Sequence, residues 1–81
     1  MLHLYPVVST SIDVVAYEDE TGVLYLRYKD TKTLYAYDDV PGLIVEELLE
    51  SESKGSYVNE EIKPFYAARR VQRLPGTRRA S

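Results

Sequence analysis

The chain has 81 residues, enough for one small domain, and a domain of this size buries only about 60% of the surface that its unfolded chain exposes. It holds no cysteine and a single histidine, His3, which excludes a disulfide framework, a thiolate nucleophile and a zinc site within the chain. Eight tyrosines stand against one phenylalanine and no tryptophan. Tyrosine favours strands because its ring packs well on a half-buried pleated surface.

The charge is divided unevenly along the chain. Residues 1–68 hold 5 Lys/Arg and 13 Asp/Glu, a net charge of −8, whereas residues 69–81 hold five arginines and no acid, a net charge of +5. No run approaches the roughly 20 apolar residues of a membrane span, and the N-terminus lacks a signal-peptide pattern. We therefore expect a soluble, cytoplasmic protein with an acidic domain and an arginine-rich extension that is partly helical and then disordered.

Three β-strands are predicted in the first half of the chain. They span residues 12–17, 23–29 and 34–38. The segments between them are short and rich in acids, glycine and threonine, as turns are. Short turns between successive strands indicate an antiparallel meander.

The register of the meander can be predicted from the loop lengths. A four-residue first loop pairs Tyr17 with Leu24, and a two-residue second loop pairs Tyr28 with Tyr35. Both loops place one set of side chains on the same face, which we predict to be the core face. This set is Val15, Tyr17, Leu24, Leu26, Tyr28, Tyr35 and Tyr37. The tyrosines are therefore expected in the core rather than as stacking platforms for bases.

An α-helix is predicted after the meander, beginning at Val40-Pro41-Gly42, because proline suits a first helical position. The apolar stripe of this helix consists of Leu43, Ile44, Val45, Leu48 and Leu49. Gly55 is expected to end it with a left-handed cap, and Asn59 to cap a short second helix. Pro64 either kinks that second helix or begins a new one through residues 65–74.

The predicted fold is thus α+β: a three-stranded antiparallel β-meander with one α-helix packed on a face and a short C-terminal helical segment. The second sheet face is too apolar to meet solvent, so we expect it to be covered. The candidates are residues 65–74, the N-terminal segment at residues 2–5, and a second subunit or partner. This face carries Val14, Ala16, Val23, Tyr25, Arg27, Leu34 and Ala36.

Catalytic and metal-binding patterns are not evident in the sequence. His3 has no serine near it in the chain, and the acidic groups lack the alternating carboxylates and fixed glycine of a calcium loop. The four glycines stand apart from one another, which excludes a glycine-rich phosphate loop. We expect a non-catalytic protein with no cofactor and no metal.

Several short features stand in a particular order along residues 7–66. They are Ser9-Thr10-Ser11-Ile12, Val15-Ala16-Tyr17, Leu24-x-Leu26-x-Tyr28, Tyr35-Ala36-Tyr37, Val40-Pro41, Leu48, residues 53–59 and Ile62-Lys63. Together they resemble the KTSC domain, a family of about this length named for its occurrence at the C-terminus of some lysyl-tRNA synthetases. Tyr35 and Tyr37 match its central Tyr-x-Tyr motif, and residues 53–59 match its Ser-x-Gly-x-aromatic-x-Asn segment.

The sequence departs from the family pattern at two positions. Lys32 stands where the family often has a glycine before Tyr-x-Tyr, so the second turn is expected to differ, and Ala16 replaces a frequent glycine before Tyr17. The resemblance implies a standalone bacterial or phage protein without an established activity, and with a suggested role in RNA binding.

The leading functional hypothesis is a non-catalytic binding module that contacts RNA or another phosphate-bearing ligand through the second sheet face and the arginine-rich extension. The residues expected to make these contacts are Tyr25, Arg27, Arg69, Arg70, Arg73, Arg78 and Arg79. The main argument against it is the acidic domain, which would repel a polyanion.

The alternative is a protein-interaction or homo-oligomerising module, because a small domain gains stability by association. It includes a phage-type protein that sequesters a nucleotide ligand between subunits. The face expected to associate carries Val23, Tyr25, Leu34 and Ala36.

Overall fold

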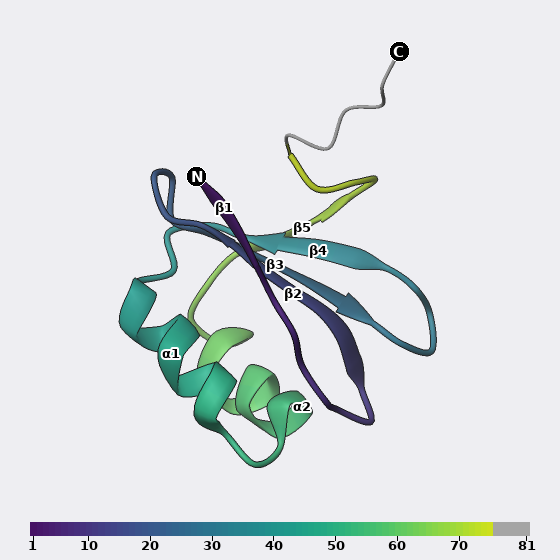
Figure 1. Ribbon diagram of the computed structural model, residues 1–81. Coiled ribbons are helices and arrows are strands. Elements are labelled where there is room, and N and C mark those ends of the chain that lie inside the picture. The colour runs from purple at the N-terminus through teal and green to yellow at the C-terminus, as the bar shows by residue number, and fades with distance from the viewer. Residues whose placement is uncertain (76–81) are drawn as a thin grey trace.

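The structure, a computed structural model, describes residues 1–75. It is an α+β domain in which a five-stranded antiparallel sheet, of order β1-β2-β3-β4-β5, carries its helices on one face (Figure 1). The strands are β1 (Leu2–Tyr5), β2 (Ile12–Glu18), β3 (Val23–Tyr28), β4 (Leu34–Tyr37) and β5 (Ala68–Val71). The helical elements are α1 (Gly42–Glu50), α2 (Lys54–Tyr57) and the π-helical η1 (Val58–Ile62), which continues α2. None of the helices within residues 1–75 has the length and apolar character to cross a membrane.

The predicted meander forms the centre of the sheet, but the expectation of only three strands is wrong. β1 pairs with β2 at one edge, and β5 pairs with β4 at the other. The helix expected through residues 65–74 does not form, because Ala68–Val71 is this edge strand. The strand satisfies backbone groups of β4 that would otherwise lack partners, and so short a segment shows no periodicity that would reveal the pairing.

The predicted core face of the sheet is confirmed, although one register differs. Tyr17 lies opposite Leu24 as predicted, and Gly22 takes a left-handed φ of 76° in the turn between them. Between β3 and β4, however, Tyr35 lies opposite Leu26 rather than Tyr28. Since side chains alternate with a period of two, a shift of two residues keeps the same side chains on the core face.

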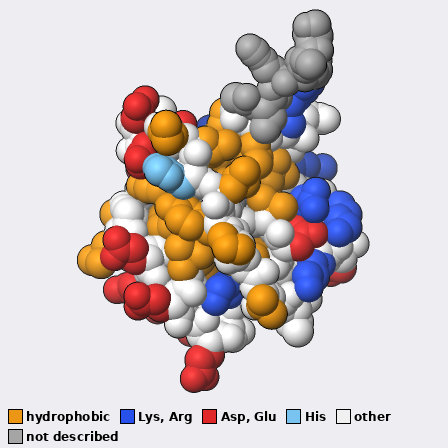
Figure 2. Space-filling view, viewed as in Figure 1, with side chains coloured by type: hydrophobic (Ala, Val, Ile, Leu, Met, Phe, Trp, Pro, Cys, Tyr) orange, Lys and Arg blue, Asp and Glu red, His pale blue; other side chains and the backbone are white. Residues whose placement is uncertain are grey.

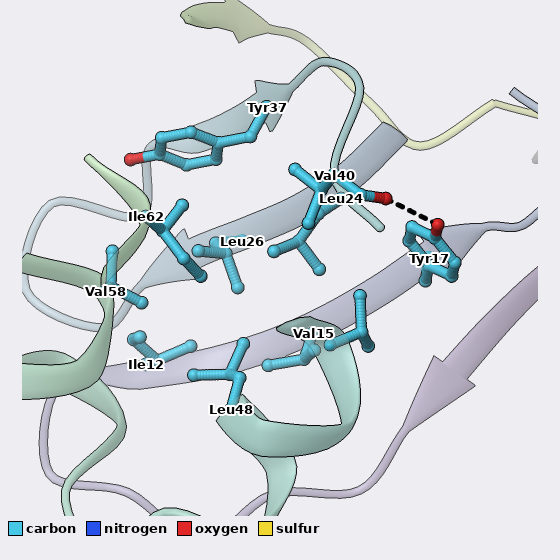
Figure 3. Packing of buried hydrophobic residues seen from close by; sticks show 11 residues of the cluster. Ile12, Val15, Tyr17, Leu24, Leu26, Tyr37, Val40, Leu48, Val58 and Ile62 are labelled. Carbon is cyan, nitrogen blue, oxygen red and sulfur yellow. Dashed lines mark hydrogen bonds between the residues drawn. The ribbon is translucent and has the colours of Figure 1, made fainter. Parts of the chain in front are cut away.

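The core lies between this face and the helices (Figure 3). Its most deeply buried members are Ile12, Val15, Leu24, Leu26, Val40, Leu48, Val58 and Ile62. Leu48 of α1 points toward β2, and the Tyr37 ring lies near Ile62 of η1. The Tyr17 hydroxyl donates a hydrogen bond of 2.6 Å to the Val40 carbonyl, which fastens the segment before α1 to the sheet. Tyr37 is thus a core residue as predicted, at 2% exposure.

The Ser-x-Gly-x-aromatic-x-Asn segment begins the second helical region instead of ending the first. Ser53 is the N-cap of α2, and its hydroxyl accepts a hydrogen bond of 3.3 Å from the Ser56 amide. Gly55 lies inside α2, where a Cβ would approach the Ser11 hydroxyl oxygen to 3.0 Å. The expected left-handed cap at Gly55 and the expected cap at Asn59 are therefore wrong. This glycine is required by close packing and not by its backbone conformation.

Candidate anion-binding groove

The second sheet face is covered by the chain itself at its centre. Tyr25 is 7% exposed, and Leu2 of β1, Val71 of β5 and Leu74 pack against the cluster that contains it. The coverage comes from the edge strands β1 and β5 beside the face and from Leu74, which follows β5. The four residues considered for association, Val23, Tyr25, Leu34 and Ala36, are each no more than 8% exposed. An oligomer through this face would therefore bury little further apolar area.

A groove of about 470 Å³ lies on the second face, between the β3–β4 turn and β5. Among residues 1–75, four cationic residues line it: Arg27, Lys32, Arg70 and Arg73. Arg70 lies opposite Tyr35 in the β4–β5 ladder, so its Cβ is on the helix-bearing face and the residue borders the groove at the edge of the sheet. Leu34 and Val71 contribute apolar surface between them. Figure 2 shows lysine and arginine side chains gathered on the side of the molecule that holds this turn and strand, whereas most acidic side chains in view lie elsewhere.

One carboxylate orients two of the four cations. Asp13 accepts hydrogen bonds from Arg27 Nε at 2.9 Å, Arg27 Nη2 at 3.1 Å and Lys32 Nζ at 3.0 Å. The pairing of β2 with β3 shifts between Ile12 and Val14, and this bulge brings Asp13 to the face that carries Arg27. The hydrogen bonds from Arg27 and then from Lys32 hold the pKa of Asp13 well below its usual range.

Lys32 reaches Asp13 from an unusual backbone conformation. Its φ is 58°, in the left-handed region that glycine adopts freely and that costs other residues about 1 kcal/mol or more. A glycine at this position would keep the turn but supply no side chain. The lysine therefore adds a cation to the groove at a small conformational cost.

The two remaining cations, Arg70 and Arg73, have no counter-ion in the part of the chain that the structure describes. Within residues 1–75, neither of these two side chains makes a hydrogen bond or an ion pair, and both residues are exposed. Together with Asp13, which pairs with two of them, the four cationic residues of the described chain give this region a charge of +3, whereas the whole chain has a net charge of −3. Guanidinium groups match the oxygens of a phosphate in a bidentate geometry, so the arrangement is suited to binding an anion.

The predicted contact residues separate into four groups. Arg27, Arg70 and Arg73 come together in the groove, whereas Arg78 and Arg79 lie outside the described residues. Arg69 pairs with Asp38 through Nη2–Oδ1 and Nε–Oδ2 distances of 3.0 and 3.2 Å, which fastens β5 to the end of β4. Tyr25 is buried, and burial raises the pKa of its hydroxyl.

Lys32 is a groove residue that sequence reasoning did not select. The sequence did contain a signal, because Lys32 stands where the KTSC family often has a glycine. It was not interpreted as functional because the bulge that brings Asp13 to the same face is not visible in the sequence.

The ion pairs of Asp13 predict a specific acid sensitivity. Because the pKa of Asp13 is lower in the folded chain than in the unfolded chain, its pairs stabilise the fold above about pH 4 and are lost as the pH falls further. The melting temperature of the wild type should therefore fall more steeply between about pH 5 and pH 2 than that of Asp13→Asn. Circular dichroism melts at several pH values measure this difference, with Glu46→Gln as a control that should follow the wild type. Parallel curves for wild type and Asp13→Asn would contradict the assignment.

Other polar clusters of the described residues offer less. No group of three or more His, Cys, Asp or Glu side chains within residues 1–75 could hold a metal ion. His3 Nε2 lies 2.9 Å from Asp19 Oδ2 in an exposed pair that joins β1 to the turn after β2. This pair lies at the opposite edge of the sheet from the groove.

Comparison with known proteins identifies the family to which this domain belongs. The sequence profile of the KTSC domain matches residues 8–66, more than half of the chain. The chain belongs to the KTSC domain family. The matched part contains Asp13, Arg27 and Lys32 but ends before β5, so the KTSC domain supplies one wall of the groove and the following strand supplies Arg70 and Arg73.

Relatives and a solved structure agree with this assignment. A protein of Tsukamurella paurometabola is 35% identical over 65 residues, which cover 80% of this chain and 96% of the relative. An uncharacterized protein of Stutzerimonas stutzeri is 34% identical over 56 residues, which cover 69% of this chain and 78% of the relative. The crystal structure of a KTSC domain protein from Yersinia pestis superposes with a TM-score of 0.81 at 22% identity, covering 89% of this chain and all of that chain. This last likeness shows a shared fold.

Proposed function

We propose that this KTSC protein is a non-catalytic binding module that holds RNA by its phosphates in the groove of Arg27, Lys32, Arg70 and Arg73. The observation that carries the proposal is the gathering of four cationic residues around one groove, where a single carboxylate pairs with two of them and the two arginines of the β5 region have no counter-ion among residues 1–75. Phosphate contacts supply most of the affinity of non-specific nucleic-acid binding. The groove volume of about 470 Å³ is in the range of small-ligand sites, so it can admit a phosphate with part of its nucleotide.

The acidic composition of the domain is compatible with this proposal. Many of the carboxylates belong to the β2–β3 turn and to α1, away from the β3–β4 turn and β5. Exposed charges farther apart than the Debye length of about 8 Å are largely screened at physiological salt. A polyanion is therefore attracted locally to the groove while the rest of the surface disfavours other orientations.

Salt-dependent binding of a short single-stranded RNA tests the proposal. The logarithm of the association constant should fall linearly with the logarithm of salt concentration, by about 0.7 for each phosphate contact. Lys32→Gln should remove one such contact and weaken binding about three- to tenfold, as expected for a hydrogen bond to a charged group. Fluorescence anisotropy of a labelled RNA measures both quantities.

Lys29→Gln is the matched control, because Lys29 is exposed next to the same turn but does not line the groove. It removes the same charge and should change binding by less than about twofold, the effect of an exposed, screened charge that makes no direct contact with the ligand. Equal losses for the two variants, or binding that is insensitive to salt, would contradict the proposal. Sedimentation of the same samples examines the homo-oligomer alternative, which would show a dimer without an RNA complex.

A further inference from the structure

The strand β1 lies at one edge of the sheet and has no neighbour on its outer side among residues 1–75 (Figure 1). It carries no lysine, arginine, aspartate or glutamate, whereas the opposite edge strand β5 carries Arg69 and Arg70. Proteins commonly use charges of this kind to protect an edge strand from pairing with another chain. The edge at β5 is therefore protected by its sequence, and the edge at β1 is not.

The outer side of β1 presents the backbone groups of two residues. The Asp19 amide donates a hydrogen bond of 3.5 Å to the Met1 carbonyl at the start of the β1–β2 ladder. Since bonded and non-bonded pairs alternate in an antiparallel ladder, the odd-numbered residues of β1 direct their backbone groups toward β2. Leu2 and Leu4 direct their N–H and C=O groups away from the sheet. These four groups form a template for a further strand.

The side chains of Leu2 and Leu4 add apolar surface beside this template, on the second face of the sheet. Leu4 lies opposite Ala16, a member of the cluster on that face, and is 62% exposed. Leu2 packs against the same cluster and is only partly buried. Figure 2 shows hydrophobic side chains gathered on the part of the surface where Figure 1 places β1. A strand that pairs with β1 would therefore cover apolar side chains as well as backbone groups.

A second copy of β1 fits this edge in one register. A two-fold axis perpendicular to the sheet keeps the helices of both copies on one side, so residues of the same face oppose each other. With Leu2 opposite Leu4 of the other copy, all four outward groups of each strand form hydrogen bonds. A shift by two residues in one direction places Leu2 opposite Pro6, which has no N–H to donate. A shift in the other direction leaves the outward groups of Leu4 beyond the end of the other β1.

We infer that this chain forms a two-fold dimer in which β1 pairs antiparallel with β1 of a second copy and joins the two sheets into one. Leu2 and Leu4 of both copies form an apolar strip on the second face, and His3 lies opposite His3 on the helix-bearing face. So short a strand buries less than the roughly 1,200 Å² of a stable interface, so the dissociation constant should be about 10–100 µM.

The dimer differs from an association through the second face, whose central residues stay covered by their own chain. It is also independent of RNA binding. The groove lies beside β5 at the opposite edge of the sheet, so it stays open in both copies.

Single cysteine substitutions test the register, because the chain has no cysteine of its own. His3→Cys places two thiols opposite each other in a non-hydrogen-bonded pair, with Cα atoms about 4.5 Å apart, a distance that a disulfide spans. With copper phenanthroline as the oxidant, this variant should form a disulfide-linked dimer on a non-reducing gel. Leu4→Cys is the control in the same strand. Its two thiols lie on a diagonal across the axis, about 7–8 Å apart, so it should cross-link about tenfold more slowly.

Sedimentation equilibrium in buffer without RNA measures the dimer directly. Leu4→Lys should weaken dimerisation about tenfold or more, because it removes an apolar contact and places a charge on the edge strand. Leu43→Lys is the matched control, since Leu43 is 65% exposed on α1 and lies away from β1. It makes the same substitution at nearly the same exposure and should dimerise like the wild type.

Three results would each overturn the dimer: a wild type that stays monomeric at about 1 mM, well above the expected dissociation constant; equal dissociation constants for the two lysine variants; or faster cross-linking of Leu4→Cys than of His3→Cys. A dimer that forms without RNA and responds to the variants as described supports it, whether or not the groove binds RNA.

Discussion

Reversing the charge of both unpaired groove arginines, Arg70→Glu with Arg73→Glu, is expected to weaken the binding of short single-stranded RNA about a hundredfold or more. A hydrogen bond to a charged group contributes about 1.5–3 kcal/mol, so losing two of them accounts for about 3–6 kcal/mol. The salt dependence should decrease as well, by about 0.7 for each phosphate contact that is lost. Fluorescence anisotropy across a salt series measures both effects. The fold should be retained, because both side chains are exposed and make no interaction within the described residues.

The control for this experiment changes the same net charge elsewhere. Lys29→Glu with Lys54→Glu alters two exposed or partly exposed lysines that do not line the groove. Lys54 donates one hydrogen bond to the Ser51 carbonyl, so the control variant is first checked for an unchanged melting temperature. It should lose less than about tenfold in RNA affinity, through long-range repulsion alone. If the two double variants lose equally, net charge governs the affinity and the groove is not the binding site.

Leu48→Ala is expected to have the largest effect on stability. The side chain is 0% exposed and lies between α1 and the sheet (Figure 3). Truncating a fully buried leucine typically costs about 2–5 kcal/mol through lost burial and the cavity that remains. For a domain of this size, about 4–8 °C is lost for each kcal/mol, so the melting temperature should fall by about 10–30 °C. Thermal and urea unfolding monitored by circular dichroism measure this change.

Leu43→Ala is the matched control on the same helix. Leu43 is 65% exposed, so its truncation should change the free energy of unfolding by no more than about 0.5 kcal/mol. A Leu48→Ala variant that melts within a few degrees of the Leu43→Ala variant would show that α1 does not cover the sheet as described. Comparing these two variants therefore tests whether α1 packs on the core face of the sheet and leaves the second face without a helix.

The core face of the sheet could be predicted from the sequence because it depends on local alternation. Tyr17 and Leu24 are paired as their loop length predicts. The β3–β4 register differs by two residues, yet Tyr35 and Tyr37 remain on the helix-bearing face, because alternation has a period of two. Leu48 could likewise be placed in the core from the apolar stripe of its helix.

The groove could be predicted only in part. Arg27 and the arginines after residue 68 were identifiable as cations of an otherwise acidic chain. Their convergence depends on the pairing of Leu34 with Val71, two residues far apart in the sequence. The bulge between Ile12 and Val14 could not be predicted either. One extra residue in so short a strand does not visibly change the alternation of apolar and polar residues.

The sequence by itself thus determined which side chains are available and which face of the meander is apolar, since both follow from composition and from a period of two along each strand. Only the tertiary structure decided which cations remain free. Arg69 and Arg70 are adjacent in β5, but Asp38 pairs with Arg69 and leaves Arg70 without a counter-ion within the described residues. The physical reason is that an edge strand receives its partners from a distant part of the chain, and those partners determine whether each charge is neutralised or left to bind a ligand.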